Sequence, residues 1–243
     1  MSPYGQTRAP HTAMCTDMAQ APEIDVREIE VVEDFTAAAR CDEGWLQVRR
    51  LRCRNRRADG TTSPIYRVDV VDRPLLDAVA VMVFRRSQAG AEVLTRRQLR
   101  PAAYFRKDRS EAIEDGRSHL FVEEIVAGLL EPGDRGEAGI RFRAALEVKE
   151  EAGFEVSPEE ILLLGGPYFL APGILSEKMF PCAVDVTGME QAVPRGDGSP
   201  LEEGGALRWR PIDELVRACR SGEIQDARTE IGTTRLAAHL AAL

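Results

Sequence analysis

The chain has 243 residues, 44% of them hydrophobic, and a formal net charge of −8. This length suits one substantial domain, or one domain with a smaller appendage, and the hydrophobic fraction is normal for a packed core. The acidic balance argues against a nucleic-acid binder, because such a protein needs a dominant basic surface to neutralise phosphates.

The sequence shows no signal for membrane insertion or secretion. The longest wholly apolar run, residues 78–84, is far too short to cross a bilayer, and residues 1–22 lack the apolar stretch of a secretory signal. The five cysteines are scattered and never form a C-x-x-C pair. We therefore expect a reduced, cytoplasmic protein.

The N-terminal part of the chain divides into two predicted segments. Residues 1–24 are rich in small, polar and proline residues without a period, which predicts a mobile tail. Residues 25–75 are β-rich, and within them residues 45–55 and 63–73 flank an Asp-Gly turn at positions 59–60. This pattern predicts a β-hairpin in a small N-terminal antiparallel sheet.

Residues 76–243 are predicted to form the main domain. Residues 77–86 and 91–100 form a second strand pair, and the apolar character of the first predicts a central strand. A helix is expected over residues 137–152, before a glycine that suits its C-terminal end. The remaining predicted elements are a charged loop at 106–118, strands at 119–128, 160–165, 178–186 and 206–211, a glycine- and proline-rich loop at 187–205, and helices at 212–220 and 226–241. The predicted fold class is α+β, with helices packed on a curved mixed sheet.

The predicted acidic helix carries three glutamates on one face. Residues 146–154 read LEVKEEAGF and place Glu147, Glu150 and Glu151 at spacings of three and four residues. Like charges at these spacings repel, and alone they usually mark a solvated face. Carboxylates that converge from one helix can instead hold Mg²⁺, a hard cation that also binds substrate phosphates. The order of strand ending at Gly128, loop and acidic helix favours the metal interpretation.

This segment resembles the signature of the Nudix hydrolases, G-x5-E-x7-R-E-U-x-E-E-x-G-U, in which U is a bulky aliphatic residue. The matching positions are Glu147, Val148, Glu150, Glu151 and Gly153, with Phe154 in the last U place. The resemblance implies an α/β/α sandwich and a Mg²⁺ site that could also take Mn²⁺. It implies Glu147, Glu151 and the carbonyl of Ala127 as metal ligands. Glu150 would complete the metal shell.

Two departures from the signature affect the site. Leu146 stands where the signature has arginine, a residue expected to orient the glutamates, and Gly128 lies four residues further upstream than the signature allows. Two acidic residues compete for the place of the first glutamate of the signature. Asp134 has the signature spacing from Gly128, whereas Glu137 lies one residue off the signature spacing from Leu146. We expect Leu146 to pack on the apolar stripe of the helix, and Arg143, one turn earlier, to take over the orienting role.

A second segment narrows the expected substrate. Residues 96–104 read RRQLRPAAY and resemble the R-Q-x-R-x-A-A-Y segment of ADP-ribose and nucleoside-diphosphate-sugar pyrophosphatases. The resemblance implies that Arg100 binds the pyrophosphate, for which a planar guanidinium is suited, and Arg97 is a further substrate-binding candidate. The resemblance extends over residues 45–240. It implies a homodimer in which the small N-terminal sheet is exchanged between subunits.

The activity implied by the resemblance is metal-dependent hydrolysis of the pyrophosphate bond, giving a nucleoside monophosphate and a sugar phosphate. In this branch the base that takes the proton of water often comes from a loop after the signature helix. Glu202 and Glu203 are the first candidates here, and Glu177 is the second. A catalytically weakened module that only binds nucleotide sugars is the alternative, because of Leu146 and the lengthened loop. The sequence leaves the base and the sugar of the substrate open.

Overall fold

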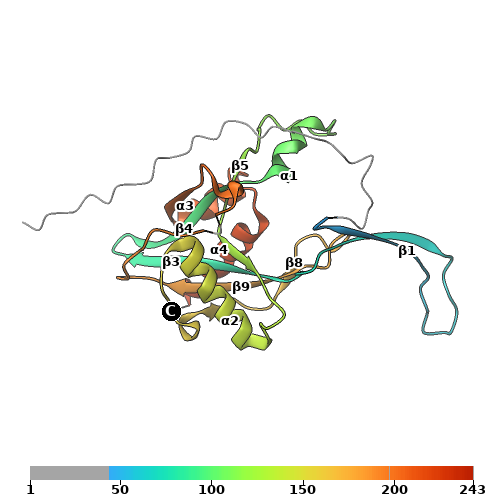
Figure 1. The fold of residues 1–243 in the computed structure, drawn as a ribbon, viewed down its shortest axis with the longest axis horizontal. Coiled ribbons are helices and arrows are strands. Elements are labelled where there is room, and N and C mark those ends of the chain that lie inside the picture. The colour runs from blue at the N-terminus through green and yellow to red at the C-terminus, as the bar shows by residue number, and fades with distance from the viewer. Residues whose placement is uncertain (1–43, 197, 243) are drawn as a thin grey trace, which may run out of the picture.

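The computed structural model describes residues 44–196 and 198–242, which contain two sheets (Figure 1). The small sheet pairs β1 (Gln47–Cys53) antiparallel with β2 (Tyr66–Asp72), so the predicted hairpin is confirmed. The predicted mobile tail and the first part of the predicted N-terminal subdomain lie outside the described residues.

The large sheet is built from eight strands. They are β3 (Ala78–Ser87), β4 (Gly90–Leu99), β5 (Phe121–Glu124), β6 (Val126–Leu129), β7 (Leu162–Leu163), β8 (Tyr168–Phe169), β9 (Lys178–Asp185) and β10 (Ala206–Pro211). The main path runs in the order β10-β4-β3-β9-β7, while β5 pairs with β4, β6 with β3 and β8 with β9. β3 and β9 run parallel and the other pairs run antiparallel, so the sheet is mixed, as predicted.

Helices cover both faces of the large sheet (Figure 1). The α-helices are α1 (Pro101–Tyr104), α2 (Gly136–Glu147), α3 (Ile212–Arg220) and α4 (Ala227–Ala241). Shorter turns are the 3₁₀ turns η1 (Phe105–Asp108), η3 (Pro158–Glu160) and η4 (Pro200–Glu202), and the π-helical turn η2 (Val148–Ala152). In the described part of the chain, no helix is long and apolar enough to span a membrane.

Strand β3 supplies a core on each face of the sheet. Val81 lies in one hydrophobic cluster with Ala144 of α2. Met82, on the opposite face, lies in a second cluster with Leu215 of α3 and Leu236 of α4. Because both faces are buried, β3 reads as a continuous apolar run, and this explains why the sequence predicts a central strand. The predicted α+β class, with helices packed on a mixed sheet, is confirmed.

Three local elements differ from the prediction. The predicted strand at 119–128 divides into β5 and β6, because the backbone N–H of Ile125 bonds to the hydroxyl of Thr229 at 3.1 Å. The predicted helix at 137–152 is α-helical only as far as Glu147 and continues as η2. Helix α1 was not predicted; it begins at Pro101, whose fixed φ suits a first helical position.

The β1–β2 hairpin projects from the body of the molecule as an arm, residues 45–72 (Figure 1). It joins the body where the Val71 N–H donates to the Ile174 carbonyl at 2.8 Å. Large apolar side chains on the arm face solvent, since Trp45 is 53% exposed and Ile65 is 62% exposed. A two-stranded sheet of this kind buries too little surface to be stable alone.

Candidate functional site

The three glutamates of the acidic helix lie where α2 passes into η2. Glu147 is the last residue of α2, and Glu150 and Glu151 belong to the π-helical turn. Such turns widen a helix locally and occur frequently at functional sites. The turn ends at Gly153, whose φ of 78° lies in the left-handed region. A Cβ there would lie 2.0 Å from the Ala192 carbonyl oxygen, so only glycine fits without a shift of the backbone.

The acidic helix packs directly on strand β6. A Cβ at Gly128 would lie 1.8 Å from Oε1 of Glu147, so the glycine leaves the space that this carboxylate occupies. The carboxylate of Glu151 accepts a hydrogen bond from the Ala127 N–H at 3.2 Å. The structure therefore brings Ala127, Gly128 and the glutamates together, although the loop between them is longer than the signature allows.

Desolvation and neighbouring charges shift the pKa values of the two partly buried glutamates of this cluster, Glu147 and Glu151. Burial, followed by the charges of Glu151 and Glu150, raises the pKa of Glu147 to about 8. Burial also raises the pKa of Glu151, although the charge of Arg96 and its hydrogen bond oppose this shift. A negative charge on Glu147 is therefore costly, because desolvation and two neighbouring carboxylates both disfavour it. A bound cation would offset that cost.

The arrangement of side chains does not itself form a metal cage. Among residues 44–196 and 198–242, no group of three or more His, Cys, Asp or Glu side chains is placed to hold a metal ion. Glu151 is turned toward Arg96 of β4, with which it forms an ion pair. The donor set still fits Mg²⁺ in kind, because carboxylate and carbonyl oxygens are its ligands. The raised pKa of Glu147 fits a cation as well. Glu151 would have to exchange Arg96 for the ion.

A cleft of about 250 Å³ opens beside the glutamates. The charged residues that line it are Arg96, Arg97, Arg195, Glu150, Glu151 and Glu202. Arg96 is only 8% exposed and lies between two carboxylates, paired with Glu151 and 3.3 Å from Glu202. Burial acts to lower the pKa of Arg96, but the charge of Glu151 and the hydrogen bond with it outweigh burial, so the pKa is raised. Arg96 is a buried guanidinium that lines a cleft suited to phosphates.

The loop at 187–205 brings Glu202 to this cleft. The Gly196 N–H donates to the Glu150 carbonyl at 3.1 Å, which fastens the loop to the end of the acidic helix. The Glu202 carboxylate accepts a hydrogen bond from the Gly198 N–H at 3.3 Å. A Cβ at Gly196 would lie 2.1 Å from the same carboxylate, so the loop closes tightly around it.

The other two candidates for the base lie outside the cleft. Glu203 is exposed and is not among the lining residues. Glu177 pairs with Arg73 at 2.5 Å, where the arm meets the body, and its side chain is 12% exposed. The structure therefore places only Glu202 of the three beside Glu150 and Glu151.

The two arginines predicted to bind substrate differ in position. Arg97 lines the cleft, and its guanidinium lies 4.0 Å from the centroid of the Phe121 ring. Arg100 is not among the lining residues and is paired with Glu124. Glu124 is 2% exposed and also accepts a hydrogen bond from Arg228 at 2.6 Å.

Arg96 and Arg195, which line the cleft, were not predicted as site residues. Neither were Glu124, which pairs with Arg100, and Arg228, which pairs with Glu124. The sequence did contain a signal for Arg96. Alternate residues of a strand share one face, so Arg96 and Arg100, which are four residues apart, are expected on the same face. No local signal connects Arg228 with Glu124, since they are 104 residues apart in the chain.

Arg143 forms a buried ion-pair cluster beside the acidic helix. Its guanidinium lies 2.8 Å from Asp134 and 3.1 Å from Glu131, and the side chains of Arg143 and Asp134 are 9% and 7% exposed. Arg143 precedes Glu147 by one helical turn, and its charge opposes the rise in the pKa of Glu147. Asp134, which keeps the signature spacing from Gly128, is therefore the partner of Arg143.

Leu146 does not occupy the packed position that was expected. It is only partly buried and belongs to neither hydrophobic cluster. The inward positions at this end of the helix are Ala144, Ala145 and Val148. Position 146 lies about 200° around the helix from position 144, which turns it away from the core.

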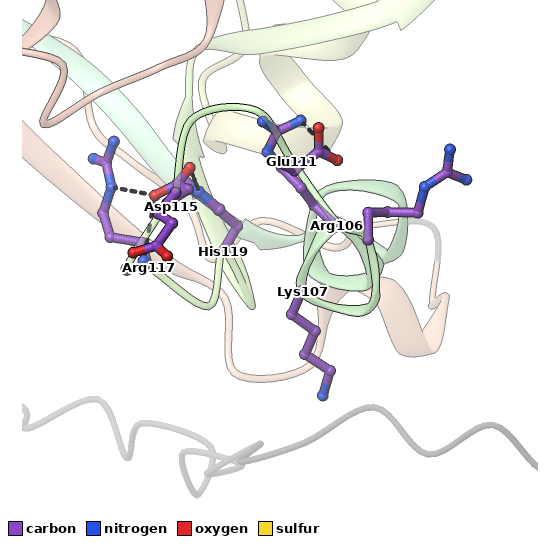
Figure 2. A pocket seen from close by; sticks show the side chains of 9 residues that line it. Arg106, Lys107, Glu111, Asp115, Arg117 and His119 are labelled. Atoms are coloured by element: carbon purple, nitrogen blue, oxygen red, sulfur yellow. Dashed lines mark hydrogen bonds and ion pairs between the residues drawn. The ribbon is translucent and has the colours of Figure 1, made fainter.

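A hollow of about 280 Å³ lies at the charged loop predicted for 106–118 (Figure 2). Asp115 lies 2.6 Å from His119 and 3.6 Å from Arg117, whereas Lys107 points away from them (Figure 2). The hydrogen bond from His119 is the largest cause of a lowered pKa at Asp115. Within the loop, Asp115 pairs with His119 and Arg117, and Arg106 lies 3.7 Å from Glu111.

No protein-family model matches the chain, and no curated protein matches it. The residues and distances given above are therefore the basis for a functional assignment.

Proposed function

We propose that this protein is a Nudix-type pyrophosphohydrolase that acts on ADP-ribose or a related nucleoside-diphosphate sugar. The observation that carries the proposal is the packing of Glu147 into the space left by Gly128, beside the partly buried carboxylate of Glu151 and a cleft with three arginines. The products would be a nucleoside monophosphate and a sugar phosphate. The resemblance of LEVKEEAGF to the Nudix signature supports the same assignment.

The metal site of the proposed enzyme comprises Glu147, Glu150, Glu151 and the carbonyl of Ala127, which would hold Mg²⁺ or Mn²⁺. The ion would polarise the phosphoryl oxygens and lower the pKa of a bound water. The cost of a negative charge on Glu147 supports this site.

The side chains of the cleft have distinct roles in the proposed reaction. Arg96, Arg97 and Arg195 neutralise the charge on the diphosphate, to which guanidinium groups bind in a bidentate manner. Arg96 pairs with both Glu151 and Glu202, so its movement toward a phosphate would release both carboxylates. Glu202, once released, accepts the proton of the attacking water. Arg100 remains a candidate for the diphosphate if substrate competes with Glu124 for its guanidinium.

Arg143 orients Glu147 in the proposed enzyme in place of the arginine that Leu146 replaces. Its ion pairs with Asp134 and Glu131 fix the guanidinium, and its charge opposes the rise in the pKa of Glu147. The longer loop after Gly128 supplies both acidic partners.

The arm belongs to a homodimer interface in this proposal. Its exposed apolar residues, among them Trp45 and Ile65, need a partner surface, and a second copy of the chain would supply it. Light scattering should give twice the chain mass of 26.8 kDa at micromolar concentration. A monomer would contradict the dimer but not the hydrolase. The cytoplasmic location expected from the cysteines stays a prediction.

A second candidate function is a module that binds nucleotide sugars without cleaving them. The ion pair between Arg96 and Glu151 favours it, because Glu151 is the residue that a catalytic metal needs. The two functions differ in one measurable property, which is turnover that depends on a divalent cation.

The experiment that tests the proposal is a substrate screen with the full chain. ADP-ribose, ADP-glucose, GDP-mannose and UDP-glucose are each incubated with Mg²⁺, with Mn²⁺ and with EDTA, and released phosphate is detected after coupling to a phosphatase. We expect at least one substrate to be cleaved with either metal and none with EDTA. Binding without cleavage of any substrate would favour the second candidate function.

A further inference from the structure

The cleft continues past Arg97 into a neighbouring hollow. Arg97 lines both the cleft and this hollow, which has a volume of about 370 Å³. The guanidinium of Arg97 lies 4.0 Å from the centroid of the Phe121 ring, so a cation–π pair stands at the boundary between the two spaces. Arg97 is exposed and Phe121 is partly buried, which leaves the pair open to a ligand.

Two kinds of polar side chain lie at the rim of the hollow: those that make no hydrogen bond in the described part of the chain, and one histidine that an aspartate holds in place. Within the described part of the chain, the side chains of Gln225 and Ser118 make no hydrogen bond, and both residues are exposed. His119 is held by Asp115 at 2.6 Å, in the arrangement of Figure 2. The rim therefore presents hydrogen-bonding groups that a ligand can use, next to a histidine whose position is held by Asp115.

The two acidic residues of the hollow, Glu123 and Glu223, are bound by arginine and threonine side chains. Glu123 lies 3.0 Å from Arg210 and accepts a hydrogen bond from Thr95 at 2.7 Å. Glu223 lies 2.6 Å from the same guanidinium. Arg210 is shared by both carboxylates and by Glu214, at 3.7 Å, so it offsets only part of their charge. Arg97 and Arg117 add positive charge to the hollow.

We infer that this hollow binds the nucleobase of the substrate, stacked on the Arg97–Phe121 pair, while the diphosphate lies in the cleft. This inference rests on the proposed function for the class of substrate. Every base presents a flat π-face, which stacks on aromatic rings and on guanidinium groups. The amide of Gln225 presents a donor and an acceptor side by side, and such a pair can bind the edge of a base. Arg97 stands between the two halves of the ligand and can contact both.

The test measures binding rather than turnover. The affinities of AMP, GMP, UMP and CMP, and of ribose 5-phosphate, which lacks a base, are measured by calorimetry with the full chain. We expect one nucleotide to bind more tightly than ribose 5-phosphate. Phe121→Leu should weaken that nucleotide about tenfold and leave ribose 5-phosphate unchanged. Phe169→Leu is the matched control, because Phe169 is also an aromatic residue beside a cation, Lys178, but it is 47% exposed and lies outside the hollow.

A second variant tests the base site independently of the fold of Phe121→Leu. This is needed because Phe121 is partly buried. Gln225→Ala, at an exposed position, should lower the preference for the best base by about fivefold. If Phe121→Leu binds nucleotides as wild type does, or loses nucleotide and ribose 5-phosphate in parallel, the base site is wrong.

The two proposals fail in different ways. Nucleotide binding that depends on Phe121, without cleavage of any nucleotide sugar, would support the base site and overturn the hydrolase. Cleavage with a KM unaffected by Phe121→Leu and Gln225→Ala would support the hydrolase and overturn the base site.

Discussion

The end of the acidic helix and the loop at 106–119 both combine carboxylates with arginines, but they balance charge in opposite ways. At the helix end, burial and neighbouring carboxylates raise the pKa of Glu147 to about 8. In the loop, the pKa of Asp115 is lowered, first by His119, and its side chain is 26% exposed. At the helix end, desolvation and neighbouring carboxylates disfavour the charge on Glu147, whereas the partners of Asp115 in the loop favour the charge on its carboxylate. A bound cation would therefore stabilise the helix end more than the loop.

The largest effect, a loss of turnover, is expected from Glu151→Gln. This change removes a charged ligand without removing volume, so turnover should fall by about a thousandfold, or about 4 kcal/mol of transition-state stabilisation. Steady-state kinetics on the best substrate measure it. Glu155→Gln is the control, because Glu155 follows the same helix and pairs only with Lys149, at 2.8 Å. Wild-type rates for both Glu151→Gln and Glu147→Gln would show that the helix end does not bind the catalytic metal.

A loss of stability is the main effect expected from Arg143→Ala. If Arg143 only oriented Glu147, its removal would lower turnover with little change in melting temperature, but the guanidinium is buried against Asp134. Removal would leave an unpaired carboxylate that is 7% exposed, at a cost of about 3 kcal/mol in urea unfolding. Lys149→Ala, which breaks an exposed ion pair, should cost much less. Equal costs for the two variants would contradict the buried role of Arg143.

The pH dependence of stability tests the raised pKa of Glu147 directly. Glu147 has a higher pKa in the folded state, about 8, than in the unfolded chain, where the reference value is 4.5. The folded state therefore keeps a proton that the unfolded state loses, so its contribution to stability is full below pH 4.5 and is lost as the pH rises toward 8. A rise in pKa from 4.5 to about 8 corresponds to roughly 5 kcal/mol by linkage, and partial exposure of Glu147 reduces this. Metal-free wild type should therefore lose on the order of 2–5 kcal/mol more than Glu147→Gln over this range. Mg²⁺ should restore the loss, and parallel pH profiles for the two proteins would exclude this account.

The sequence predicted the strands and turns whose residues carry a local pattern. It predicted only some of the residues that meet in the candidate site. The apolar run of β3 and the Asp-Gly turn of the arm are local patterns, and both elements are present. The grouping of Glu147 with Gly128 followed from the signature and is seen in the packing. The pairing of Arg96 with Glu151 depends on which strand lies under the helix end, and no spacing in the sequence encodes it. The position of Leu146 was misjudged because an apolar residue was assumed to face the core.

The smallest effect, on melting temperature, is expected from Asp115→Asn, in the charged loop. The carboxylate of Asp115 pairs with His119 and Arg117 in contact with solvent, where ion pairs contribute little and salt screens them. Because its folded pKa is lowered, its contribution to stability is present above the unfolded pKa and is lost only as the pH falls below it. At neutral pH the melting temperature of Asp115→Asn should match that of wild type, at low and at high salt. A drop as large as that of Arg143→Ala would mean that the loop is as dependent on its charges as the helix end, and the contrast between the two regions would be lost.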